Sequence, residues 1–67
     1  MENLYLAEFH YNYYADHEYA SAIMTRLVIA DNPVGAQEKA MNFWNNNYAK
    51  SDIIVSLDEI EISLPII

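Results

Sequence analysis

The chain has 67 residues, with ten acidic side chains, three basic ones and no cysteine, which gives a formal net charge of −7. That length allows a single domain, expected to span residues 1–67, with one small core and no disulfide or thiolate metal site to support it. Binding to nucleic acid needs lysine and arginine to replace counterions, so the charge excludes direct contact with DNA or RNA and disfavours anionic membranes.

The first element is a strand predicted over about residues 3–14. Alternate positions carry the apolar and aromatic side chains Tyr5, Ala7, Phe9, Tyr11 and Tyr13. The positions between them carry Leu6, Glu8, His10 and Asn12. A period of two with this many aromatic residues is typical of a strand with one buried face. The polar segment 15–18 then predicts a hairpin loop.

The second element, about residues 19–30, has two interpretations. As a helix it would begin at an Asp16 cap, and Tyr19, Ile23, Leu27 and Ala30 would share one face. As a strand it would alternate throughout, and the β-branched run at 25–29 favours this interpretation. We therefore predict a strand that pairs with the first one, with the helix as the alternative.

The third element is a helix predicted over about residues 33–48. Asn32 is a good N-cap, because its side-chain oxygen can accept from a free backbone N–H, and Pro33 suits the first helical position. The spacing of one buried stripe is followed by Ala36, Ala40, Phe43 and Trp44.

The last element is a strand predicted over about residues 52–64. Two alternating sets of apolar residues have opposite phase: first Ile53, Val55 and Leu57, then Ile60, Ile62 and Leu64. Side chains change face at every residue of a strand, so the change of phase at 58–59 predicts a bulge or a bend there.

Together these elements predict an α+β fold, a small two-layer β-β-α-β domain. Its three-stranded antiparallel sheet has the order 2-1-3, because the helix returns the chain to the side of the first strand. The single helix packs on one face of the sheet. The other face would carry the mixed set Leu6, Glu8, His10 and Asn12.

No segment carries a catalytic, metal or nucleotide signature, so we expect no enzymatic activity, no cofactor and no metal. His10 and His17 lie on a strand and in the following loop, and not at the spacing of helical metal ligands. The carboxylates at 58, 59 and 61 are more typical of a solvated edge strand than of acid–base catalysis. With one glycine in the chain, no phosphate-binding loop is expected.

Two groups of residues are candidates for contact with a protein partner, which the charge predicts to be basic. An acidic set could steer that partner, although acids also serve solubility alone. This set is Glu8, Asp58, Glu59 and Glu61. Tyrosine is enriched at protein interfaces, and four tyrosines flank the hairpin loop. These are Tyr11, Tyr13, Tyr14 and Tyr19.

A homodimer is also predicted, because a core this small usually needs a further source of stability and the chain ends on apolar residues. Its candidate contacts are Leu64, Ile66 and Ile67. The beginning of the chain lacks the features of a signal peptide, and no apolar run approaches the ~20 residues of a membrane span. We therefore expect a cytoplasmic protein.

In size, charge and plan the chain resembles the small acidic proteins that phages make to block host defence or DNA-handling enzymes. The resemblance involves no specific residues, and it implies an inhibitor that occupies a partner's surface. The expected function is therefore non-enzymatic protein binding. Two alternatives of other classes are a nucleotide-binding sponge with its pocket at a subunit boundary and a structural subunit of a larger assembly.

Overall fold

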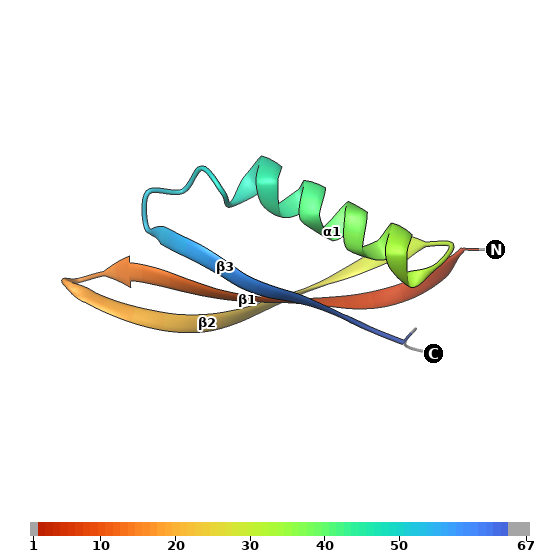
Figure 1. Ribbon diagram of the computed structural model, residues 1–67, viewed down its shortest axis with the longest axis horizontal. Helices are drawn as coiled ribbons and strands as arrows, with labels where there is room; N and C mark the ends of the chain where they lie inside the picture. The colour runs from red at the N-terminus through yellow and green to blue at the C-terminus, as the bar shows by residue number, and fades with distance from the viewer. Residues whose placement is uncertain (1, 65–67) are drawn as a thin grey trace.

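The computed structural model describes residues 2–64, which form three strands and one helix. In chain order these are β1 (Asn3–Ala15), β2 (Glu18–Ala30), α1 (Pro33–Asn47) and β3 (Ile54–Ser63). The strands form one antiparallel sheet in the order β2-β1-β3, and α1 lies over one face of it (Figure 1). The predicted α+β fold is confirmed, and the second element is a strand.

The hairpin of β1 and β2 is closed by a two-residue loop, Asp16 and His17, which lies between the paired residues Ala15 and Glu18. Both loop residues have positive φ, 51° at Asp16 and 65° at His17. Positive φ at both positions is the property of a type I′ turn, whose twist matches that of the flanking strands. Residues other than glycine pay about 1–2 kcal/mol for this conformation, so the turn is a strained point of the fold.

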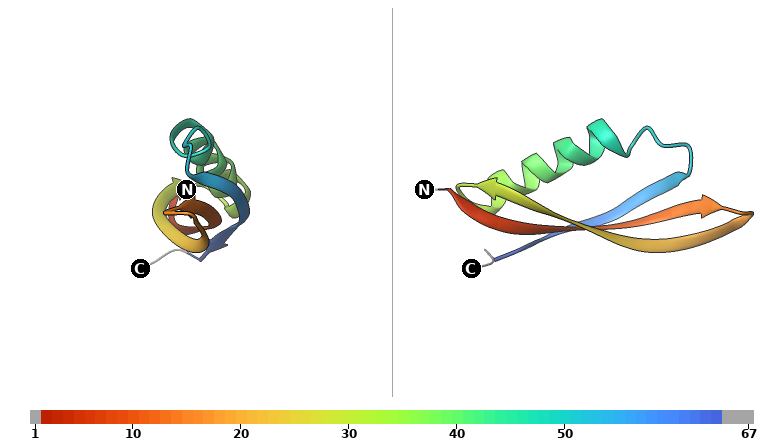
Figure 2. Two further views of the ribbon diagram at one scale, coloured as in Figure 1. Left: turned by 90° about the vertical axis from the view of Figure 1, so that its left-hand side faces the viewer. Right: turned by 180° about the vertical axis from the view of Figure 1, so that it is seen from behind.

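The hairpin is much longer than the helix that covers it. A 13-residue strand spans about 44 Å, whereas the 15-residue helix spans about 22 Å. The molecule is accordingly 46 Å long, and the closed end of the hairpin projects beyond α1 (Figure 1). Figure 2 shows from two further sides how strongly the strands twist beneath the helix.

The start of α1 is stabilised as the sequence predicts. The Asn32 side-chain oxygen accepts from the Gly35 backbone N–H at 2.8 Å, and Pro33 follows at the first helical position. At the other end the Tyr48 backbone N–H donates to the Trp44 carbonyl at 2.8 Å. Lys39, on the middle of the helix, donates from Nζ to the backbone carbonyl of Ile29 on the outer strand β2 at 2.6 Å.

The core lies between α1 and the sheet. Ala36 and Ala40 are fully buried and let the helix approach the strands closely, while Trp44 fills the space farther along. The Trp44 ring stacks on Phe9 of β1 with centroids 5.4 Å apart, and Phe9 is completely buried. Phe43, expected in the same buried stripe, is only half-buried, and the Arg26 guanidinium lies 3.9 Å from its ring centroid.

Two register shifts in β3 decide which of its side chains reach the core. The first leaves Asp58 without an opposite residue on β1, where the sequence predicts a bulge. The second does the same at Val55 and was not predicted. Ile54 and Leu57 therefore both pack on the core, whereas Val55 is 56% exposed. The expectation that Val55 shares the face of Leu57 is wrong, because the extra residue reverses the alternation.

Candidate functional site: the open face of the sheet

One face of the sheet is turned away from α1, and we refer to it as the open face. Residues directly opposite one another in antiparallel strands lie on the same face, so the strand register defines its members. From one end to the other, β1 contributes Leu4, Leu6, Glu8, His10, Asn12 and Tyr14. The opposite residues on β2 are Ile29, Leu27, Thr25, Ile23, Ser21 and Tyr19. On β3, the residues opposite Glu8, His10 and Asn12 are Glu61, Glu59 and Ser56.

The outer strand of the open face carries a row of exposed aliphatic side chains. Ile23, Leu27 and Ile29 are 60%, 54% and 53% exposed. Beside them on the central strand lie Leu4 and Leu6, which are partly buried by their neighbours. These exposed aliphatic side chains form an apolar surface, and its contact with water is unfavourable in free energy.

Carboxylates gather on the other side of the open face. Glu8 and Glu61 are directly opposite each other, and Glu59 is opposite His10. The His10 Nε2 atom lies 3.5 Å from a carboxylate oxygen of Glu8 and 3.5 Å from one of Glu61. Three of the four acids predicted as a partner-binding set therefore lie side by side, on strands that the sequence places next to each other.

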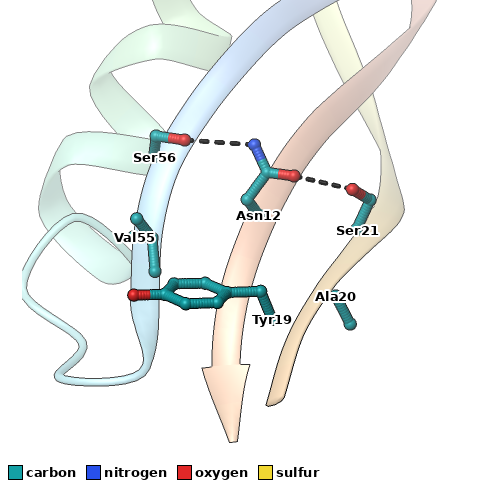
Figure 3. A pocket seen from close by; sticks show the side chains of 6 residues that line it. All are labelled: Asn12, Tyr19, Ala20, Ser21, Val55 and Ser56. Atoms are coloured by element: carbon teal, nitrogen blue, oxygen red, sulfur yellow. Dashed lines mark hydrogen bonds between the residues drawn. The ribbon is translucent and has the colours of Figure 1, made fainter.

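Asp58, the fourth of those acids, belongs to a polar bridge across all three strands. Its centre is Asn12, whose amide donates to Asp58 Oδ2 at 2.9 Å and to Ser56 Oγ at 3.1 Å. Ser21 Oγ donates to the Asn12 side-chain oxygen at 2.6 Å (Figure 3). The carboxylate of Asp58 therefore already accepts a hydrogen bond within the sheet, which makes it less suited to bind a partner.

A shallow hollow of about 290 Å³ lies beside this bridge and is drawn in Figure 3. The Tyr19 ring extends from β2 towards Val55 on β3, and the bridge of Asn12 forms the opposite side (Figure 3). The hollow is open to solvent along the surface, and its lining is a mixture of methyl, hydroxyl and ring groups. The hollow makes the open face concave at this point, and none of its lining residues is charged.

The four tyrosines predicted to contact a partner are divided between the two faces. Tyr14 and Tyr19 form a pair on the open face, with ring centroids 4.7 Å apart and exposures of 40% and 76%. Tyr11 lies on the helix side, with its ring centroid 5.3 Å from that of Trp44. The ring centroids of Tyr13 and Tyr11 are 6.2 Å apart. Only the pair at the hairpin end is therefore part of the open face.

Of the three predicted dimer contacts, the structure describes Leu64, which directly follows β3. Leu64 is 82% exposed, whereas Ile66 and Ile67 lie outside the described residues. Among the residues that the structure describes, no helix is long and apolar enough to cross a membrane.

Two features of the open face were missed from the sequence. The grouping of Glu8, His10 and Glu61 could be predicted only in part. Glu8 and His10 are two residues apart on one strand and therefore share a face, whereas Glu61 joins them only through the register of β3. The central role of Asn12 had no signal, since only the strand register shows that Ser21 and Ser56 lie opposite it.

No protein-family model, curated protein or solved structure matches the chain. What the open face can do therefore follows from its own residues. It combines exposed aliphatic side chains, a group of carboxylates and an exposed tyrosine pair on one surface, a combination suited to contact with another macromolecule.

Proposed function

We propose that this protein is a non-enzymatic binding protein that occupies a basic protein surface with its open face. The observation that carries the proposal is the row of exposed aliphatic side chains, Ile23, Leu27 and Ile29, on a sheet face that α1 leaves uncovered. Exposed apolar patches bordered by polar groups mark interaction sites. The apolar row supplies the contact area whose burial favours a complex.

The negative charge of the protein favours a partner of positive charge. The net charge is −7, and Glu8, Glu59 and Glu61 lie on the same face as the aliphatic row, on β1 and β3. A cluster of one sign attracts a surface of the opposite sign and raises the association rate by about 10–10³. A basic protein is therefore the occupant that the open face fits, and proteins that handle nucleic acids are basic because they bind phosphates. Occupying such a surface would inhibit its owner.

The first experiment asks which surface makes the contact. The immobilised protein is exposed to a cell lysate in three forms: wild type, an open-face variant with Ile23→Ser and Leu27→Ser, and a control variant with Val34→Ser and Met41→Ser. The control residues are apolar, lie on α1 and are 68% and 38% exposed. We expect a basic protein to be retained by the wild type and the control and to be lost by the open-face variant.

The captured protein is then purified and its association rate is measured at several salt concentrations. Replacing Glu59 and Glu61 by glutamine should slow association and flatten its dependence on salt, because exposed charges are screened over ~8 Å at physiological ionic strength. Retention of the same protein by the open-face variant, or a partner that is not basic, would refute the proposal.

The homodimer stays a prediction, and the same variants test whether a second copy occupies the open face. Sedimentation velocity at micromolar concentration would show a dimer for the wild type and a monomer for the open-face variant if the aliphatic rows of two copies meet. In that outcome the open face is not free for a basic partner. A monomer in both samples leaves the open face available, as the proposal requires.

A further inference from the structure

Three side chains in the middle of the open face present metal-binding atoms to one another. Glu8 and His10 are two residues apart on β1 and therefore point to the same side of the sheet. Glu61 on β3 is directly opposite Glu8. One carboxylate oxygen from each glutamate and one imidazole nitrogen all lie within 4.8 Å of one another. We propose that Glu8, His10 and Glu61 bind a divalent transition-metal ion, for which Zn²⁺ is the best match.

The distances fit a shared ion better than they fit hydrogen bonds. His10 Nε2 is 3.5 Å from the nearest oxygen of both Glu8 and Glu61. An N–H···O hydrogen bond is usually 2.7–3.2 Å long, so both contacts are too long. Tetrahedral ligands bound to Zn²⁺ at about 2.0–2.1 Å are about 3.4 Å from each other. The two observed separations are therefore close to the edges of a zinc coordination tetrahedron.

The shielding of the His10 Nε2 atom from solvent supplies a second reason. The atom is shielded from solvent and has no hydrogen-bond partner among the described residues, although the His10 side chain as a whole is 30% exposed. A shielded polar atom without a partner destabilises the fold, because no hydrogen bond replaces the water that it has lost. Since this atom faces two carboxylates, an ion placed between them would satisfy it and would also offset the repulsion between the two negative charges.

The ligand set selects the class of ion. One imidazole and two carboxylates suit Zn²⁺ and its neighbours in the first transition series. Mg²⁺ and Ca²⁺ are hard cations that prefer oxygen ligands, so the imidazole nitrogen of His10 is a poor ligand for them. Three protein ligands would leave the fourth tetrahedral position to water, so the ion would be accessible from the open face.

The experiment is a calorimetric titration of metal-free protein with Zn²⁺, with Mg²⁺ as the comparison ion. We expect one Zn²⁺ per chain at micromolar concentration and no saturable binding of Mg²⁺. Replacing a ligand should weaken binding at least about tenfold, since even indirect supports of a metal ligand cost that much. The variants are His10→Asn, Glu8→Gln and Glu61→Gln. The Glu61 side chain is 59% exposed, so Glu61→Gln should leave the fold intact.

Two controls separate this site from general attraction of cations to an acidic protein. Glu59→Gln removes an equal charge from the position opposite His10, outside the set of ligands, and should leave the affinity unchanged. The two histidines provide the second control in one nuclear magnetic resonance sample. The Nε2 resonance of His10 should shift on addition of Zn²⁺, while that of His17 in the hairpin loop should not.

The proposal is overturned if Zn²⁺ does not saturate, if His10→Asn binds as tightly as the wild type, or if His17 responds as His10 does. It is also overturned if Glu59→Gln weakens binding as much as Glu61→Gln. None of these measurements involves a protein partner, so the result stands apart from the proposed function.

Discussion

Removal of the Phe9 ring should abolish most of the stability of this domain. Phe9 is completely buried and contacts two rings of the helix, Trp44 at 5.4 Å and Phe43 at 6.1 Å between centroids. A buried phenylalanine replaced by alanine costs about 3–5 kcal/mol, and aromatic pairs contribute about 0.5–1.5 kcal/mol beyond the area they bury. A 67-residue domain has a total stability of about 3–10 kcal/mol. Phe9→Ala should therefore be largely unfolded at 25 °C.

The assay is urea unfolding followed by the fluorescence of Trp44, the only tryptophan of the chain, which reports directly on the contact between helix and sheet. Phe43→Ala is the matched comparison, because Phe43 is also a phenylalanine at the same interface but is only half-buried. It should lose less stability than Phe9→Ala and should still show a cooperative transition. An unchanged urea midpoint for Phe9→Ala, or a larger loss for Phe43→Ala, would show that the core is not centred on Phe9.

Three further substitutions test single features of the backbone. Asp16→Asn combined with His17→Gly should raise the free energy of unfolding by about 1 kcal/mol, because Asn-Gly suits positive φ at both positions of the turn; a lower thermal midpoint would contradict the turn geometry. Gly35→Ala should stabilise α1 by roughly 0.5–1 kcal/mol, since the added Cβ would lie 3.5 Å and 3.6 Å from its nearest neighbours, at ordinary contact distances; destabilisation would mean that the helix start is packed more tightly. Asn32→Ala should cost about 1 kcal/mol through loss of the N-cap and Asn32→Gly only a few tenths, and equal losses would argue against a side-chain cap.

The order of the elements could be predicted because each depends on a local signal. The strand β1 follows from its alternation, and α1 follows from its capping residue, its proline and the spacing of its small and aromatic residues. The order β2-β1-β3 follows from the rule that a helix returns the chain to a neighbouring strand. The bulge at Asp58 also had a local signal, because the apolar residues change phase there.

The parts that could not be predicted depend on pairing between distant residues. Residues 53–55 are three consecutive apolar side chains, so alternation cannot show which of them faces the core. Their faces are set by the second register shift against β1, which brings Ile54 inwards and leaves Val55 exposed. The division of the tyrosines, in contrast, follows from local alternation, since Tyr13 and Tyr14 are adjacent in sequence and therefore lie on opposite faces of one strand.

The hydrogen bond from Lys39 to the Ile29 carbonyl has a consequence for aggregation. An outer strand presents unpaired backbone groups on which the strand of another molecule can add. Lys39 occupies one of these groups and places a cation beside it, at the end of β2 that α1 reaches. The opposite end of β2 runs past the helix, so its protection depends on repulsion between molecules of net charge −7 (Figure 1). That repulsion vanishes near the isoelectric point of about 4.3. Light scattering should therefore rise as the pH falls towards this value. A Lys39→Ala variant has a lower isoelectric point because it has lost a cation, so each protein is compared at its own isoelectric point, where the variant should scatter more light than the wild type.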